Sequence, residues 1–265
     1  MRLKSLLGRI VRPAPEPEPP PPSSNPPLID VEGVCPVCEQ QTRFQSWGPG
    51  LRDGFICITC HSLPRERALF AVLARVCPGW RGLQVHESSP SEGPGKLARE
   101  CPGYTASHYD PGRPLGEISE QGWRNEDLER QTFEDGRFDL VITQDVFEHL
   151  LEPDRAIREI ARTLKPRGLH VATVPLARKT KPSRRRARRL DDGSVKLLRA
   201  AEHHANPIDP QGSLVTVDWG YDIADYFDRH AGLSTTVVAI EDFSRGIAGD
   251  MIEVLVSRKA APPRL

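Results

Sequence analysis

Residues 126–175 read EDLERQTFEDGRFDLVITQDVFEHLLEPDRAIREIARTLKPRGLHVATVP, and this stretch decides the fold because it contains a strand, a helix and a second strand. RFDLVITQ (137–144) is a short continuous apolar run, which is typical of a parallel strand buried on both faces. DRAIREIARTLK (154–165) places its apolar residues on one helical face, and GLHVATVP (168–175) is the next strand. This order predicts one strand–helix–strand unit of an α/β fold.

The same alternation continues on both sides of that unit. It predicts an α/β domain over residues 81–258, with a doubly wound, mostly parallel sheet that ends in a closing strand pair, and a tail at 259–265. The remaining strands are predicted at 83–87, 103–109, 234–240 and 251–257, and the remaining helices at 62–76 and 222–232.

The bulk composition argues against several classes of protein. The chain has 265 residues, with 36 Lys and Arg against 36 Asp and Glu, so no global charge indicates a nucleic-acid or membrane partner. No run approaches the roughly 20 apolar residues of a membrane span. The basic start MRLKSLLGRIV (1–11) has too short an apolar core for a signal peptide. We therefore expect a cytoplasmic protein with reduced thiols and no membrane partner.

The N-terminal part of the chain differs in composition from the rest. Residues 12–27 are mostly proline and polar, and they offer little apolar surface to bury, so we predict a disordered, proline-rich segment at 1–30. A cysteine module (31–62) and a connecting helix (63–80) follow before the α/β domain begins.

Four of the six cysteines form two C-x-x-C pairs, Cys35 with Cys38 and Cys57 with Cys60. Each tight turn can supply two thiolates to a tetrahedral Zn²⁺, and the 18 residues between the pairs leave room for a short hairpin. The spacing therefore predicts a zinc ribbon with a structural metal. A redox role is the alternative, but a single C-x-x-C pair would suffice for it. A closed four-sulfur site leaves no open position for catalysis.

Polar residues gather where the predicted strands end. Asp127 lies in a loop, Asp145 directly follows the strand at 137–144, and Glu148 and His149 come next. In open α/β sheets, ligands bind outside the carboxyl ends of the strands, near the point where the strand order reverses. We therefore expect these four side chains at or near the binding edge of the sheet.

The same segment matches a family motif at many spaced positions. FDLV (138–141) comes after Asp127, and VFEH (146–149) follows the strand. LKP (164–166) then ends the helix. With these residues the segment resembles the class I S-adenosylmethionine-dependent methyltransferases of the type 11 group. The resemblance implies a Rossmann-like sheet with an antiparallel C-terminal strand, and methyl transfer from S-adenosylmethionine to an acceptor.

A subgroup of that family joins a four-cysteine ribbon and a P-R-x-R-x-L helix to this fold, and the chain resembles the subgroup as well. PRERAL (64–69) matches the helix, and HESSP (86–90) matches the first loop. HHANPID (203–209) and WGYDI (219–223) match two later segments, although His-His-Ala stands where the subgroup has Tyr-His-Gly.

The resemblance also implies a set of cofactor contacts. The loop after the first strand would face the methionine part of the cofactor, and Asp145 would lie beside its sulfonium end. Asp127 would accept a hydrogen bond from the adenine amino group, with the backbone amide of Leu128 beside it. No carboxylate for the ribose can be named at the end of the second strand. The implied cofactor-binding residues are His86, Glu87, Ser88, Ser89, Gly93, Asp127, Leu128 and Asp145.

Methyl transfer from a sulfonium is a direct displacement, in which an enzyme mainly aligns the acceptor and excludes water. A general base is needed only where the acceptor carries a proton, and His149 and His204 are the candidates. For His149 the alternative is a structural role at the start of a helix. The acceptor, a small molecule or a macromolecule, is not identified by the sequence.

A rival interpretation belongs to a different class of protein. In it the chain is a zinc-ribbon binding or scaffold protein whose methyltransferase-like domain has lost catalysis. The missing glycine pair of the first loop and the missing ribose carboxylate favour this alternative. We favour the methyltransferase, because the motif at 126–175 is matched at many positions.

RKTKPSRRRARR (178–189) is the one large charge cluster of the sequence. One interpretation is a contact with the phosphates of a nucleic acid. The other is a solvated, mobile insertion, which we favour because no interleaved aromatic residues offer stacking to bases.

Overall fold

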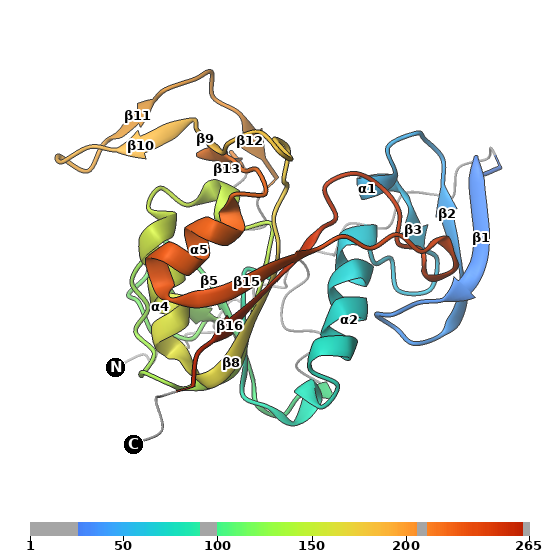
Figure 1. The fold of residues 1–265 in the computed structure, drawn as a ribbon, viewed down its shortest axis with the longest axis horizontal. Coiled ribbons are helices and arrows are strands. Elements are labelled where there is room, and N and C mark those ends of the chain that lie inside the picture. Colours follow the sequence, from blue (N-terminus) through green and yellow to red (C-terminus); the bar gives the residue numbers. More distant parts are fainter. Residues whose placement is uncertain (1–25, 91–99, 206–210, 262–265) are drawn as a thin grey trace, which may run out of the picture.

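The computed structural model describes residues 26–90, 100–205 and 211–261, and its centre is a seven-stranded sheet (Figure 1). The strand order is β15-β16-β8-β7-β4-β5-β6, in which β4 to β8 pair in parallel and β16 is antiparallel to both neighbours. The predicted fold class is therefore confirmed, and the order reverses between β4 and β7. The strands are β4 (Val85–Ser88), β5 (Tyr104–His108), β6 (Arg124–Asn125), β7 (Phe138–Gln144), β8 (Leu164–Thr173), β15 (Leu233–Val238) and β16 (Val254–Lys259).

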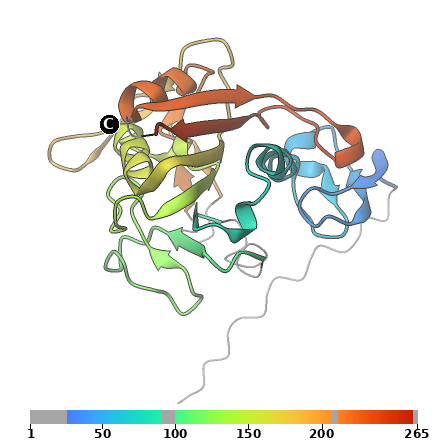
Figure 2. The same ribbon diagram turned by 60° about the horizontal axis from the view of Figure 1, so that its bottom comes forward.

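Helices cover both faces of this sheet (Figures 1 and 2). Helices α4 (Pro153–Thr163) and α5 (Ile223–Ala231) pack on one face, and α2 (Pro64–Val76) packs on the other. In β7, Val141 belongs to the core with α4 and α5, whereas Leu140 belongs to the core with α2. Because successive strand residues point to opposite faces, such a strand needs the unbroken apolar run seen in the sequence. None of the helices in the described ranges is long and apolar enough to cross a membrane.

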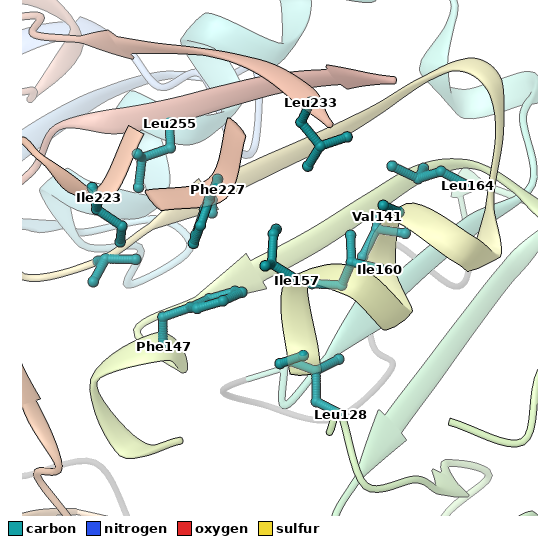
Figure 3. Packing of buried hydrophobic residues seen from close by; sticks show 14 of the residues in the cluster. Leu128, Val141, Phe147, Ile157, Ile160, Leu164, Ile223, Phe227, Leu233 and Leu255 are labelled. Atoms are coloured by element: carbon teal, nitrogen blue, oxygen red, sulfur yellow. The ribbon is translucent and has the colours of Figure 1, made fainter. Parts of the chain in front are cut away.

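Four buried side chains illustrate the core between β7 and the two helices on that face (Figure 3). Ile157 and Ile160 of α4, Phe227 of α5 and Phe147 are each fully buried in one cluster. The ring centroids of Phe147 and Phe227 lie 4.7 Å apart. Since burying one such side chain contributes about 1.5–3 kcal/mol, the apolar face of α4 fixes this helix on the sheet.

The junction of α4 and β8 differs from the prediction. The helix ends at Thr163, and β8 begins at Leu164 rather than at Gly168. Leu164 is fully buried and pairs with Phe138 of β7. Pro166 has no N–H to extend a helix, so the chain passes from the helix into the sheet without a connecting loop.

The cysteine module is a separate three-stranded antiparallel sheet beside α2 (Figure 1). Its first strand begins inside the range predicted as a disordered segment, 1–30, of which residues 1–25 lie outside the described part of the chain. The elements of the module are β1 (Ile29–Val34), β2 (Gln41–Ser46), the short helix α1 (Leu51–Gly54) and β3 (Ile56–Cys57).

The connection between β15 and β16 crosses from the α/β domain to the module (Figure 1). Its 3₁₀ turn η3 (Phe243–Arg245) contacts β1, and Gly246 follows with φ of +66°. A Cβ at Gly246 would lie 2.3 Å from the ring of Phe44, so glycine is required there. Arg67 of α2 is fully buried in the same place. It donates hydrogen bonds to the carbonyl oxygens of Phe55, Ser62 and Gly246, and thereby joins the module to the rest of the protein.

An insertion of short paired strands lies between β8 and α5 (Figure 1). In it β10 pairs with β11, β12 pairs with β13, and β9 pairs with β14, each antiparallel. The basic run at 178–189 is part of this insertion. The strands are β9 (Arg184–Arg185), β10 (Ala187–Arg189), β11 (Val195–Leu197), β12 (His203–His204), β13 (Ser213–Leu214) and β14 (Val217–Asp218).

Candidate functional site

The two C-x-x-C turns bring four sulfur atoms together in the module. The Sγ atoms of Cys35 and Cys60 lie 3.7 Å apart, and those of Cys38 and Cys57 lie 4.0 Å apart. All four lie within 4.8 Å of one another. Thiolates that share a tetrahedral Zn²⁺ at bonds of about 2.3 Å are separated by roughly 3.8 Å. The geometry of this cysteine cluster therefore fits the predicted zinc shell.

Two arginines, one from α1 of the module and one from α2, reach the carboxyl edge of the sheet. Arg52 Nη2 and Arg65 Nε lie 2.8 and 2.9 Å from Oδ2 of Asp145. The hydroxyl of Thr173 donates to Oδ1 at 3.1 Å. Asp145 follows β7 with φ of +51°, a left-handed conformation that is uncommon for residues other than glycine. Asp145 therefore lies at the end of β7, as predicted, and its carboxylate is bound by the two arginines.

A cavity of about 540 Å³, called here the edge cavity, opens beside these ion pairs. Asp145, Glu148, His149 and His204 all contribute to its wall. The turn η2 (Phe147–His149) supplies two of them, and β12 of the insertion supplies His204. The edge cavity therefore combines residues from the module, the sheet edge and the insertion.

Glu148 holds its carboxylate in the wall of the edge cavity without a hydrogen-bond partner on either oxygen. Its side chain is 2% exposed, and burial together with the charge of Asp145 raises its pKa well above the ordinary value. Oε1 lies 3.7 Å from Nε2 of His149 and 3.8 Å from Nδ1 of His204. Buried carboxylates without partners are costly, so this arrangement calls for a ligand or a proton.

His149 is held in one orientation by the insertion. Its Nδ1 lies 3.0 Å from the carbonyl oxygen of Leu214 in β13. A carbonyl oxygen only accepts, so Nδ1 donates the proton and Nε2 keeps its lone pair toward Glu148. Burial lowers the pKa of His149, which favours this neutral ring near neutral pH.

A second cavity of about 600 Å³, called here the loop cavity, adjoins the loops after β5 and β6. Tyr109, Asp127 and His149 lie in its wall. Asp127 Oδ1 accepts the backbone N–H of Glu129 at 2.9 Å, and Oδ2 lies 3.2 Å from Nε of Arg130. His149 borders both cavities, so the two lie side by side along the sheet edge.

The residues predicted to contact the cofactor from β4 divide between the core and the edge. The ring of His86 is fully buried and stacks on Phe138 at 5.1 Å between centroids, and burial lowers its pKa to about 3. Glu87 is also buried, which raises its pKa. Its two carboxylate oxygens accept hydrogen bonds from Tyr104 and Gln144, at 2.7 and 3.0 Å. His86 and Glu87 are therefore engaged with protein partners.

Ser88 and Ser89 continue β4 toward the sheet edge, and Ser89 has φ of +56° where the chain leaves the strand. Its backbone N–H donates to the carbonyl oxygen of Ser107 at 2.7 Å. Leu128 is 5% exposed and belongs to the core shown in Figure 3. Gly93, which was predicted to face the methionine, lies outside the described residues.

Comparison with known proteins gives one family match. Residues 96–172 match the family described as a methyltransferase domain. The matched residues lie within the α/β domain. No curated protein matches the chain in a sequence comparison.

Several solved structures are similar to this chain over about three quarters of its length. A Mesorhizobium loti S-adenosylmethionine-dependent methyltransferase is 14% identical with a TM-score of 0.44, and the match covers 72% of this chain and 98% of that one. A Burkholderia thailandensis 1,6-didemethyltoxoflavin-N1-methyltransferase is 16% identical, with a TM-score of 0.43 and coverage of 74% and 78%. A Pyrococcus horikoshii protein, PH0226, is 19% identical, with a TM-score of 0.43 and coverage of 74% and 89%.

The basic run beside the α/β domain is more ordered than the predicted mobile insertion. Arg184 and Arg186 form ion pairs with Asp218 at 2.6 and 3.1 Å, and Arg189 pairs with Glu129 at 3.1 Å. Between them Ala187 is fully buried. Several of the charges in the run are therefore neutralised by acids of the same chain. The sequence pattern missed this because those acids are 32 or more residues away in the chain, with Glu129 60 residues from Arg189.

Two functional-site residues escaped the sequence interpretation. Arg52 has no local signal, because its partner Asp145 is 93 residues away. Arg65 is the first arginine of the P-R-x-R-x-L motif, and the second, Arg67, is the buried link to the module. The motif therefore marked two arginines that matter, but only the fold shows which groups they bind.

Proposed function

We propose that this chain is an S-adenosylmethionine-dependent methyltransferase in which the cofactor lies along the loop cavity and the acceptor lies in the edge cavity. The observation that carries the proposal is the position of His149 in the wall of both cavities. Transfer requires two bound molecules that meet at one point, and adjoining cavities at the carboxyl edge of a parallel sheet suit that requirement.

The side chains around the loop cavity suit the cofactor in size and chemistry. Ligand pockets usually enclose about 300–1,000 Å³, and the loop cavity has about 600 Å³. A carboxylate has about four acceptor positions, so Asp127 can still accept a hydrogen bond from an adenine amino group besides its two present partners. We assign the adenine end to Asp127, in the wall of the loop cavity, and to Leu128. The methionine end would extend beyond that cavity to Ser88 and Ser89 at the end of β4 and to Asp145 in the wall of the edge cavity. His86 and Glu87 are left out of this assignment because both side chains are buried and bound to protein partners, and Gly93 lies outside the described residues.

S-adenosylmethionine supplies a methyl carbon on a sulfonium that is ready for displacement. The chain's own residues would then position the acceptor and take up its proton. His149 is neutral, and Nε2 receives no hydrogen bond from the described part of the chain, so it can accept a proton at that atom. His204 is the second candidate. It also lines the edge cavity, and its ring centroid lies 5.0 Å from that of His149. The acceptor itself is left unassigned, because a fold does not identify a substrate.

Reduced thiols are part of the same proposal. Four thiolates can hold Zn²⁺ only while they stay unoxidised, and all six cysteines are free in the structure. We therefore propose a structural zinc at the cysteine cluster and a reducing compartment such as the cytoplasm. The cluster is closed, so it holds the module and its arginines in place rather than taking part in transfer.

Calorimetric titration with S-adenosylmethionine tests the proposed function directly. The informative variant is Asp127→Asn, since asparagine can still accept the N–H of Glu129 but carries no charge for a ligand. We expect the wild type to bind and the variant to bind about tenfold more weakly, as one lost charge-assisted hydrogen bond predicts. The matched control is Asp135→Asn, because Asp135 is 81% exposed and pairs with Arg162 away from both cavities.

Two results would contradict the proposal. The first is no heat of binding up to millimolar S-adenosylmethionine. The second is an equal affinity in the wild type, Asp127→Asn and Asp135→Asn. Either result would favour a binding protein that retains the fold of a methyltransferase without its activity.

A further inference from the structure

The buried carboxylate of Glu148 and two imidazoles form a second cluster of metal-ligating side chains. The available ligand atoms of Glu148, His149 and His204 all lie within 4.8 Å of one another. The three residues come from the turn after β7 and from the insertion hairpin, and all three line the edge cavity. We propose that Glu148, His149 and His204 bind a divalent transition-metal cation in the edge cavity.

The distances allow one ion to be shared. Oε1 of Glu148 lies 3.7 Å from His149 Nε2 and 3.8 Å from His204 Nδ1. Nitrogen and oxygen ligands bind such an ion at about 2.0–2.2 Å and are then separated by roughly 3–3.5 Å. The side chains therefore need to move by roughly 1 Å or less to close on the ion.

His149 is oriented in the manner of a metal ligand. Histidines that bind metals almost always donate their other ring N–H to a carbonyl or a carboxylate. His149 meets this rule through the carbonyl oxygen of Leu214, 3.0 Å from Nδ1. His204 has the carboxylate of Glu202 near its other nitrogen, with Oε1 3.8 Å from Nε2, which is beyond hydrogen-bond distance. In each ring the nitrogen toward Glu148 is the one left for an ion.

The charges around Glu148 supply the second, independent argument. Its two oxygens have no hydrogen-bond partner and its side chain is 2% exposed. The two arginines whose charges act on Glu148, Arg52 of the module and Arg65 of α2, are already bound to Asp145. A cation between the carboxylate and the two rings would neutralise Glu148 and satisfy a buried oxygen that the protein itself leaves unpaired.

The ligand set indicates the class of ion. Two imidazoles with one carboxylate suit first-row transition metals, whereas Mg²⁺ and Ca²⁺ prefer all-oxygen shells. Three protein ligands leave coordination positions open toward the cavity, in contrast to the closed cysteine cluster. If the proposed function holds, an oxygen atom of the methyl acceptor would occupy such a position, where an ion lowers the pKa of a bound hydroxyl. The ion would then replace His149 in the task of promoting loss of the acceptor's proton, because Nε2 of His149 binds the ion.

Titration with Mn²⁺ tests the metal site without S-adenosylmethionine or an acceptor. Mn²⁺ is added to the zinc-loaded protein, and free Mn²⁺ is followed by its electron paramagnetic resonance signal. Mn²⁺ is a hard ion and discriminates against the cysteine cluster. We expect one Mn²⁺ to bind per chain. Glu148→Gln and His204→Ala should each weaken binding by at least about tenfold, since a ligand contributes no less than the residues that orient it.

The neighbouring histidine gives the matched control. His203 is exposed and lies outside the edge cavity, so His203→Ala should bind Mn²⁺ as the wild type does. Circular dichroism of each variant establishes that it folds, and His204→Ala changes only a partly exposed side chain on the insertion.

The proposal is overturned if the wild type binds no Mn²⁺, or if folded Glu148→Gln and His204→Ala both bind it as tightly as the wild type. These outcomes are separate from the test of the methyltransferase, because cofactor binding is measured at Asp127 in the absence of Mn²⁺. A chain that binds S-adenosylmethionine but not Mn²⁺ keeps its proposed function and loses only the metal site.

Discussion

The cysteine cluster and the Glu148–His149–His204 cluster gather metal-ligating side chains in opposite ways. The cysteines belong to two tight turns of a small module, and their four sulfur atoms leave no open position. The other cluster combines a turn after β7 with a hairpin of the insertion, and it faces a cavity. The closed cysteine cluster suits a structural metal, whereas the cluster at the edge cavity suits an ion that also binds a ligand.

The difference extends to the surroundings of the two clusters. Around the cysteines, Arg67 donates to three carbonyl oxygens although it is fully buried. Among the described residues, the buried side-chain atoms without a hydrogen-bond partner lie in the α/β domain instead, at Glu148, His86 and His170 among others. Satisfied buried groups specify structure, whereas unsatisfied ones are expected where ligands bind.

Loss of the structural metal should have the largest effect. Structural Zn²⁺ contributes about 10–16 kcal/mol of binding free energy in small zinc domains, so Cys60→Ser should release the metal and unfold the module. Elemental analysis measures the zinc, and hydrogen exchange measures protection in residues 29–62. Cys77→Ser, at a thiol outside the cluster, is the control. Retention of one zinc and of full protection in Cys60→Ser would show that the cluster is not a metal site.

Removal of the buried arginine should have the next largest effect. Arg67→Met keeps much of the volume but leaves the carbonyl oxygens of Phe55, Ser62 and Gly246 without their donor. Breaking such a buried charged network costs about 3–5 kcal/mol. Denaturant unfolding measures the loss, with Arg75→Met on the exposed side of the same helix as the control. Equal stability of the two variants would mean that Arg67 does not join the module to the rest of the chain.

The pH dependence of stability should report the buried histidines. Burial lowers the pKa of His86 and of His170 to about 3, below the unfolded value of 6.5. Between these values the unfolded chain binds more protons, so stability is complete above pH 6.5 and is lost as the pH falls. Each histidine contributes about 1.4 kcal/mol per pH unit in that window.

His170→Phe tests this dependence beneath the turn that carries Glu148. The ring of His170 lies 5.7 Å from Phe147 and 5.8 Å from Phe227 between centroids, so phenylalanine suits its surroundings. The slope of the unfolding free energy against pH should fall by the contribution of one histidine. The lost hydrogen bond with Thr143 lowers stability at every pH and leaves the slope unaffected. Thr143→Val, which removes the same hydrogen bond but no titratable group, should leave the slope unchanged. An unchanged slope in His170→Phe would contradict the neutral buried ring.

The ion pair between the module and the sheet edge should give the smallest effect. A double-mutant cycle with Arg65→Met and Asp145→Asn should give a coupling of about 1 kcal/mol, because both side chains are partly shielded from water. The exposed pair of Arg43 and Asp30 should give a smaller coupling in the same measurement, because water screens it. Equal couplings would mean that Arg65 and Asp145 gain nothing from their position beside the edge cavity.

Much of the architecture was predictable because it depends on local order. The apolar run at 137–144 appears as β7, and the periodic stretch at 154–165 appears as α4 with its end moved to Thr163. The two C-x-x-C pairs predicted four sulfur atoms in one place, since each turn fixes two of them at short range. Asp145 was likewise expected at the end of a strand, because the apolar run that forms β7 ends directly before it.

The partners of these residues depended on packing between distant segments. Asp145 meets Arg52 and Arg65 because α1 and α2 dock the module beside the sheet, across 79 or more intervening positions. Glu148 meets His204 because the insertion folds back over the turn after β7. Residue order determined the strands, the helices and the cysteine turns, since these follow from neighbours within a few positions. Only the tertiary structure decided which charges face one another, because burial and long-range contacts are properties of the packed chain.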